Sequence, residues 1–238
     1  MKWPAPLVKG ILIKRYKRFL ADFRLADGRV VTAHCANTGS MKTCMAEGIE
    51  GWLTYHDDPK RKLAYSWQVA VMPDGPVGIN TSLANGLVEE AIRDGMVPAL
   101  TGYDQIRRER KYGVNSRIDL LLSGPDRPDC YVEVKNVTLL LSEGEAAFPD
   151  AVTQRGAKHL DELVAMVEAG NRAVLFYCVQ RVSANRVTPA EAYDPHYAAS
   201  LRLAVSRGLE VMAHTVTMDE AGLAVAGPLP VILAPAAT

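Results

Sequence analysis

The chain has 238 residues, of which 48% are hydrophobic and 23% are charged, and its formal net charge is zero. This length suffices for one large or two modest domains with a buried core, and zero net charge argues against a simple polycation that coats nucleic acid. The segment Lys14 to Leu20 is too charged for a signal peptide, and no run of about 18 apolar residues occurs. We therefore expect a cytoplasmic protein with no membrane partner.

Charge and cysteine are distributed unevenly along the chain. Residues 1–85 hold 12 Lys and Arg against 7 Asp and Glu, whereas the remaining residues hold 15 against 20, so the basic excess is N-terminal. The four cysteines form no CxxC pair, and two lie in apolar strand-like runs. Buried, reduced thiols are expected there rather than a disulfide framework.

The first third of the chain reads as short strands separated by turns. One strand-like run, residues 10–25, leads into a hairpin turn at Ala26-Asp27-Gly28-Arg29. Further strand candidates, rich in aromatic and β-branched residues, cover residues 29–35, 48–56 and 62–72. Several strands at such spacing predict a small barrel, of which the OB-fold is the commonest kind to carry basic and aromatic residues on one face.

The period then changes to that of a helix. A cap at Thr81 or Ser82 would start a helix that ends at Gly95, with its apolar residues on one side, and we place a domain boundary between residues 81 and 82. The strands expected after it are 104–112, 116–122, 130–139, 172–180 and 209–217, and the helices are 153–170 and 195–207. The C-terminal two thirds is therefore predicted to be α/β with a mixed sheet.

Three charged residues stand on two neighbouring strand candidates in this second part. Glu133 and Lys135 share one face of their strand because alternate side chains point the same way, and Asp119 lies in the preceding strand. A register that sets Asp119 beside Glu133 brings two carboxylates together, which is unfavourable without a cation. A divalent metal resolves this conflict, since Mg²⁺ takes oxygen ligands and a nearby ammonium can help to orient or deprotonate an attacking water.

The helix before these strands offers a third carboxylate. A helical wheel puts Glu90 at the edge of the apolar face and Glu89 toward solvent, so Glu90 could reach a site at the sheet edge. The alternatives are a surface glutamate at this position and, for the E-x-K pair alone, a solvated strand face or a cross-strand ion pair. A zinc site at His34, Cys35 and Cys44 lacks a fourth ligand, and no GxSxG elbow is present for a serine hydrolase.

Basic segments elsewhere could bind nucleic acid. The stretch KRYKRF interleaves cations with aromatic rings, as in a groove that pairs phosphates and stacks bases; its predicted contacts are Lys14, Arg15, Tyr16, Lys17 and Arg18. A basic turn adds Lys60, Arg61 and Lys62, and the start of the second helix adds Arg155, Lys158 and His159, which could meet a phosphate beside the helix dipole. A solvated surface is the alternative for each of these groups.

Six segments of the chain carry a more specific resemblance: RYKRFLAD, NTGSM, PKRKL, YGVNSRIDLLL, VEVKNVTL and FPDAVTQRGAKHL. Together they are similar to the sugar fermentation stimulation protein family (SfsA), over nearly the whole chain. The order of a helix with Glu, a strand with Asp, a strand with E-x-K, a helix and a strand also resembles the PD-(D/E)xK nuclease-like superfamily. Two departures from the family pattern, Ala36 and Asp58, do not touch these charged residues.

The resemblance implies an OB-like nucleic-acid-binding domain in residues 1–81 and a PD-(D/E)xK nuclease-like α/β domain in residues 82–238. It further implies that Asp119 and Glu133 bind Mg²⁺, with Mn²⁺ as the alternative, that Lys135 positions the water, and that Glu90 assists by holding a metal-bound water. The reaction would be hydrolysis of phosphodiester bonds in DNA or RNA.

The alternative that the resemblance leaves open is a non-catalytic, sequence-nonspecific DNA-binding regulator of sugar (maltose) utilisation genes. In either case the expected partner is DNA, or else RNA, with a homodimer as one expected assembly.

Overall fold

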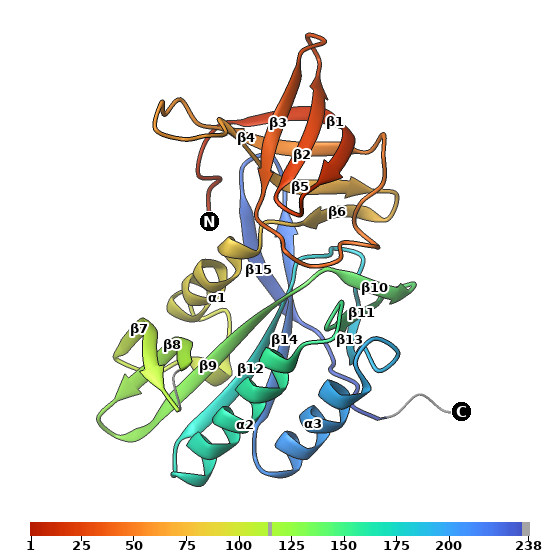
Figure 1. Ribbon diagram of the computed structural model, residues 1–238. Coiled ribbons are helices and arrows are strands. Elements are labelled where there is room, and N and C mark those ends of the chain that lie inside the picture. Colours follow the sequence, from red (N-terminus) through yellow and green to blue (C-terminus); the bar gives the residue numbers. More distant parts are fainter. Residues whose placement is uncertain (114–115, 235–238) are drawn as a thin grey trace.

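The computed structural model describes residues 1–113 and 116–234, which form a β-barrel seated on one end of a larger α/β unit (Figure 1). The strands of the N-terminal unit are β1 (Leu7–Tyr16), β2 (Leu20–Leu25), β3 (Val30–Cys35), β4 (Glu50–Tyr55), β5 (Tyr65–Met72) and β6 (Gly75–Gly78). Their order is β3-β2-β1-β4-β5-β6, and a parallel pairing of β3 with β5 closes the first five strands into a barrel. Alternate side chains fill its interior, where the rings of Phe23 and Trp67 lie 5.1 Å apart. The predicted barrel is confirmed.

The segment predicted as one strand over residues 10–25 is two strands. β1 and β2 pair antiparallel, with Tyr16 opposite Leu20, and the three residues between them make a turn in which Lys17 and Arg18 have left-handed φ values of 48° and 62°. No Gly, Asn or Pro stands at this turn, so the residue types that usually indicate one are missing. The second hairpin is confirmed, since Gly28 has φ 85° and β2 pairs with β3 on either side of it.

The second unit is built on a six-stranded mixed sheet of order β15-β14-β12-β9-β8-β7. β12 runs parallel to β9 and β14, and the other neighbours are antiparallel. The strands are β7 (Gln105–Tyr112), β8 (Ser116–Gly124), β9 (Arg127–Val137), β12 (Arg172–Val179), β14 (Glu210–Met218) and β15 (Leu223–Pro228). The predicted α/β unit with a mixed central sheet is confirmed.

Helices cover both faces of this sheet. α1 (Ala84–Arg93) packs Leu87 and Val88 on one face, and α2 (Gln154–Glu168) and α3 (Pro195–Ser206) pack on the other (Figure 1). Short 3₁₀ turns, η1 (Thr81–Leu83) and η2 (Pro98–Leu100), flank α1. The predicted cap at Thr81 or Ser82 is instead Asn80, which caps the 3₁₀ turn η1 that leads into α1. Its Oδ1 accepts a hydrogen bond from the Ser82 amide at 3.1 Å. No helix among the described residues is long and apolar enough to cross a membrane, and all four cysteines are buried free thiols.

A second, three-stranded sheet was not predicted. It consists of β10 (Leu139–Ser142), β11 (Glu145–Phe148) and β13 (Arg186–Pro189), in the order β10-β11-β13. Its strands have four residues each, and β11 pairs in parallel with a strand about 40 residues later. Neither an alternating pattern nor a local hairpin partner reveals such a strand from sequence.

Buried polar contacts fix the barrel to the α/β unit. Arg181, just beyond β12, is 3% exposed and makes two hydrogen bonds to the carboxylate of Asp74, at 2.8 and 2.9 Å. Its third nitrogen donates to the Thr43 carbonyl at 2.6 Å. The two units therefore hold a defined orientation, and the loops after β3 lie over the ends of β9 and β11.

Candidate active site at the junction of the two units

Asp119 lies in β8 at a point where the regular alternation of side chains is interrupted. Ile118 belongs to the core beneath α2, and Leu120 belongs to the core beneath α1, although residues two apart in a regular strand share a face. Glu109, which stands opposite in β7, has a left-handed φ of 53°. The interruption directs Asp119 toward β9, where its Oδ2 accepts a hydrogen bond from the Val134 amide at 2.8 Å.

The other oxygen of Asp119 is held by helix α1. Its Oδ1 accepts from the side-chain amide of Asn85 at 2.8 Å, which ties the first turn of the helix to the strand. Sequence reasoning missed Asn85. The available signal was its spacing from Val88 and Ile92, both buried, which puts a polar residue in the apolar stripe of the helix.

Glu133 is almost fully buried, with 2% of its surface exposed. Its Oε1 accepts from Lys135 Nζ at 2.6 Å and forms a short hydrogen bond with His159 Nδ1. Its Oε2 is buried and has no hydrogen-bond partner among the described residues. An unpartnered, buried carboxylate oxygen is costly, so this atom marks a place where a ligand would be favourable.

His159 is a positioning residue for Glu133. Arg155, one turn earlier on α2, donates from Nε to His159 Nε2 at 3.3 Å, so Nε2 acts as an acceptor and the ring proton is on Nδ1. The ring then donates from Nδ1 to the carboxylate of Glu133. His159, which we predicted could meet a phosphate beside the helix dipole, is buried and contacts Glu133 instead of standing open at the surface.

The two carboxylates differ in their affinity for a proton. Burial, followed by the charge of Glu133, raises the pKa of Asp119 to about 6, despite the hydrogen bonds from Val134 and Asn85. Burial also acts to raise the pKa of Glu133, but the hydrogen bond from His159 and the charge of Lys135 outweigh it and leave that pKa below its ordinary value. Glu133 therefore holds its negative charge more firmly than Asp119 does.

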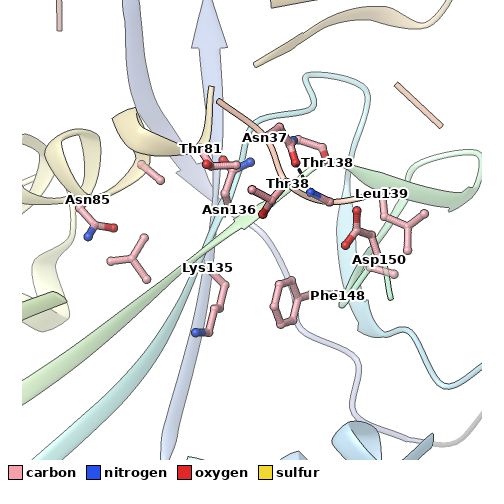
Figure 2. Close-up of a pocket in the computed structure, with 14 residues that line it drawn as sticks. Asn37, Thr38, Thr81, Asn85, Lys135, Asn136, Thr138, Leu139, Phe148 and Asp150 are labelled. Atoms are coloured by element: carbon pink, nitrogen blue, oxygen red, sulfur yellow. Dashed lines mark hydrogen bonds between the residues drawn. The ribbon is translucent and has the colours of Figure 1, made fainter. Parts of the chain in front are cut away.

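A cavity of about 300 Å³ opens beside these residues at the junction of the two units. Asp119 and Glu133 lie behind its wall, whereas their partners Asn85 and Lys135 line it. Figure 2 shows side chains from four segments around the same space. The lining residues drawn and labelled there are Asn37, Thr38, Thr81, Asn85, Lys135, Asn136, Thr138, Leu139, Phe148 and Asp150.

The barrel contributes one wall of the cavity through the loop after β3. The Ser40 amide donates to Asp150 Oδ2 at 2.7 Å, and the Gly39 amide donates to Asn37 Oδ1 at 2.8 Å. A Cβ atom on Gly39 would collide with the Asp150 carboxylate, so a larger residue here would displace that carboxylate from its hydrogen bond with Ser40. The segments NTGSM and FPDA, distant in sequence, thus meet directly.

Glu90 does not reach this site. Its carboxylate forms an ion pair at 2.8 Å with the amino group of Met1, and 45% of its side chain is exposed. Five residues separate Glu90 from Asn85, a rotation of about 140° around the helix, so the two side chains point in different directions. The prediction that Glu90 assists the metal site is therefore wrong.

The predicted basic contacts of the barrel fall into two groups. Arg15 is used within the fold, since its guanidinium donates to the carbonyls of Asn37 and Arg18, and the Tyr16 hydroxyl donates to Asp22. The remaining cations are exposed: Lys14, Lys17 and Arg18 around the first hairpin, and Lys60, Arg61 and Lys62 in the loop after β4. On α2, Arg155 and Lys158 are also exposed, and Lys158 lies 3.5 Å from Glu162.

In the part of the chain that the structure describes, no group of three or more His, Cys, Asp or Glu side chains is arranged to hold a metal ion. Asp119 and Glu133 together offer two carboxylates, one fewer than such a group. Carboxylate oxygens are the ligands that Mg²⁺ and Ca²⁺ prefer, and Mg²⁺ commonly takes only one or two from the protein while water supplies the rest. The residues present therefore fit a hard divalent cation, with the unpartnered Oε2 of Glu133 as the clearest free ligand atom.

Both units of the chain match models of known protein families. A family model described as the SfsA N-terminal OB domain matches residues 13–79, and one described as the sugar fermentation stimulation protein RE domain matches residues 82–222. A sugar fermentation stimulation protein homolog from Geobacter metallireducens is 55% identical over 237 residues, which covers 98% of this chain and 100% of that protein. Its counterpart from Maricaulis maris is 51% identical, with 98% and 99% covered.

A solved structure has the same architecture. SfsA of Pyrococcus furiosus in complex with Ca²⁺ superposes with a TM-score of 0.87 at 27% sequence identity, and the match covers 98% of each chain. The chain belongs to the sugar fermentation stimulation protein (SfsA) family, with an N-terminal OB domain followed by a restriction-endonuclease-like domain.

Proposed function

We propose that this protein is a divalent-metal-dependent nuclease that hydrolyses phosphodiester bonds in DNA or RNA at the junction of its two domains. The observation that carries the proposal is the partly buried Asp119 beside the buried Glu133, with Lys135 hydrogen-bonded to Glu133 and one Glu133 oxygen without a partner among the described residues. Two carboxylates at least partly removed from water, with a single ammonium beside them, leave negative charge uncompensated, which is costly in a structural ion cluster and useful in a metal site.

A hard cation fits this arrangement. Asp119 and Glu133 would hold Mg²⁺ or Mn²⁺, and the Ca²⁺ in the complex of the Pyrococcus furiosus relative supports a divalent ion at this fold. When bound, such an ion supplies positive charge that stabilises the pentacovalent transition state and makes water a better nucleophile at neutral pH. It would also lower the cost of keeping Asp119 ionised.

The protein's own groups have separate roles in this proposal. Lys135 lines the cavity, so its ammonium can approach a phosphate oxygen and stabilise the charge that develops on it. His159 holds Oε1 of Glu133, which leaves Oε2 for the ligand. Asn85 fixes the rotamer of Asp119 and joins it to the helix that lines the cavity.

A DNA-binding protein without catalysis is the second candidate, and one observation favours it. Glu90 is paired with the Met1 amine, so the site has two carboxylates rather than three. A weaker metal site with fewer ligands could bind nucleic acid through exposed cations and cut nothing.

Cleavage of single- and double-stranded DNA and RNA, with Mg²⁺ or Mn²⁺, tests the proposal. We expect Asp119→Asn, Glu133→Gln and Lys135→Met each to lower the single-turnover rate at least about 100-fold. Glu90→Gln, a carboxylate on the same domain but outside the site, should cut like the wild type. The melting temperature of each variant reports whether it folds.

A second readout does not depend on turnover. Ca²⁺ should raise the melting temperature of the wild type by mass action and should have a smaller effect on Asp119→Asn or Glu133→Gln. If the wild type cuts none of the four substrates with either metal but binds them in a salt-sensitive manner, the second candidate replaces the first.

A further inference from the structure

The edge of the nuclease-like domain carries a concentrated positive charge that the function proposed above does not use. Residues 105–117 contain five Lys and Arg and one Glu, although residues 86–238 as a whole have 15 basic against 20 acidic residues. Most of this segment is β7, which is the edge strand of the six-stranded sheet. Figure 1 shows β7 and β8 below α1, away from the barrel.

Four of the five cations have no partner among residues 1–113 and 116–234. Arg108 pairs with Glu89. The other four are exposed and form no ion pair or hydrogen bond with any residue in the described ranges, and they are Arg107, Arg110, Lys111 and Arg117. Arginines at the surface elsewhere in the same domain have such partners, as in the pair of exposed Arg207 with Glu168 and that of half-buried Arg202 with Glu191.

The pairing of the strands adds a repulsion to this arrangement. Lys111 and Arg117 stand directly opposite each other in the antiparallel ladder, and like charges at such a pair destabilise a sheet. A shallow cavity of about 320 Å³ is lined by both residues together with Glu109 and Arg110. An anion in that cavity would offset the repulsion.

The position of the cluster relative to the candidate active site indicates which anion this is. Arg117 and Asp119 are two residues apart in β8, a distance of about 7 Å along the strand. That is close to the spacing of successive phosphates in a nucleic-acid strand. Protection of an edge strand against aggregation would also explain exposed cations, but lysines suffice for that role, whereas arginine is favoured where planar guanidinium groups contact phosphate oxygens.

We propose that Arg107, Arg110, Lys111 and Arg117 form a phosphate-binding surface on the β7–β8 hairpin, which holds the nucleic-acid backbone beside the bond to be cut. The ligand is the phosphodiester backbone of DNA, recognised by charge without base contacts. This inference rests on the proposed function, since it assigns the flanking contacts of the same substrate.

A charge-neutralised variant tests the surface. The protein carrying Arg107→Gln, Arg110→Gln, Lys111→Gln and Arg117→Gln is compared with a matched control that loses the same charge elsewhere, Arg24→Gln, Arg29→Gln, Arg202→Gln and Arg207→Gln. Binding of a fluorescent DNA duplex and of its single strand is measured by anisotropy with Ca²⁺ present, over a range of salt concentrations.

We expect the β7–β8 variant to bind at least about tenfold more weakly and to reduce the slope of log K against log salt by roughly two to four, because each lost phosphate contact removes nearly one released counterion. The control should keep the wild-type slope. The melting temperature of the β7–β8 variant should equal or exceed that of the wild type, since the substitutions remove a like-charge pair.

Three results would overturn the inference. An unchanged slope in the β7–β8 variant while the wild type binds DNA would reject this surface alone and leave the proposed function intact. An equal loss in the control would assign the effect to net charge rather than to β7 and β8. Absence of any DNA binding by the wild type would remove both this inference and the proposed function.

Discussion

The OB domain and the nuclease-like domain differ in how their charged side chains are compensated. In the barrel, the segment from Lys14 to Arg18 is densely basic, yet Arg15 is occupied by backbone carbonyls and Lys14 lies 3.9 Å from the carboxylate of Asp22. In the nuclease-like domain, four of the five cations of the β7–β8 hairpin have no partner among the described residues, and Oε2 of Glu133 has none either. The density of basic residues in a sequence is therefore a poor measure of the cations available to a ligand, because partners distant in sequence decide it.

This contrast has an energetic meaning. A compensated charge contributes to folding, so its removal costs stability, whereas an unpaired charge that is removed from water or faces a like charge costs stability in the free protein and is useful where a ligand or a reaction neutralises it. Substitutions in the two classes should consequently change the free energy of unfolding in opposite directions.

Removing a compensated charge should have the largest effect. Arg15→Ala deletes hydrogen bonds to the carbonyls of Asn37 and Arg18, and Asn37 is buried in the loop that covers the cavity. Because hydrogen bonds from a charged donor are among the stronger ones, and the bond to Asn37 is partly buried, we expect a loss of about 2 kcal/mol in the free energy of unfolding, measured by urea denaturation. Lys14→Ala, next to it and exposed, should stay within about 0.5 kcal/mol of the wild type. Equal effects at both positions would contradict the assignment of Arg15 to the fold.

Removing an uncompensated charge should do the opposite. The pKa of Asp119 in the folded protein, about 6, lies above its ordinary value of 3.8, so the folded state binds this proton more tightly than the unfolded state does. Stability from this group is then complete below about pH 4 and is lost as the pH rises through about 6. With metal removed by a chelator, Asp119→Asn should be more stable than the wild type by about 1 to 2 kcal/mol at pH 7.5, an amount reduced from the full shift because the cavity admits water.

The same variant should show only a small gain at pH 4, where Asp119 is protonated in the folded state and partly protonated in the unfolded chain. Asparagine can keep both contacts, with its oxygen toward the Val134 amide and its amide toward a rotated Asn85. Urea denaturation at a series of pH values separates the two regimes. A gain of the same size at pH 4 and pH 7.5 would mean that packing, and not the buried charge, sets the cost at this position.

The fold and the central pair of this site could be predicted from sequence because both depend on local patterns. Alternation along residues 130–139 put Glu133 and Lys135 on one face, and the short link to the preceding strand made Asp119 their neighbour, as the structure has them. The hydrogen bonds of Asn85 to Asp119 and of His159 to Glu133 were not predicted. They depend on which face of each helix meets the sheet.

Two errors have different physical causes, one distant in the chain and one local. Glu90 is held by the Met1 amine, 89 residues earlier, and the strand expected over residues 10–25 is divided at a turn with no turn-forming residue type. The meeting of the NTGSM and FPDA segments is likewise a contact between residues 110 positions apart, as in the bond from Ser40 to Asp150. Such contacts are set by the packing of the two domains and leave no periodic signal in either segment.

The turn at Lys17 and Arg18 provides the test with the smallest expected effect. Both cations are exposed, their side chains have no ion-pair partner among the described residues, and their backbone is strained. Both residues have left-handed φ values, 48° and 62°, which cost a side chain with a Cβ roughly 1 kcal/mol that Asn and Gly largely avoid. Lys17→Asn combined with Arg18→Gly should therefore stabilise the protein by about 0.5 to 1 kcal/mol. If these cations bind DNA, the same variant should also lower the slope of log K against log salt by about 1 to 2, since strain retained at a turn then has a use. An increase in stability with an unchanged slope would exclude Lys17 and Arg18 from phosphate binding and leave the strain at this turn without a use in DNA binding.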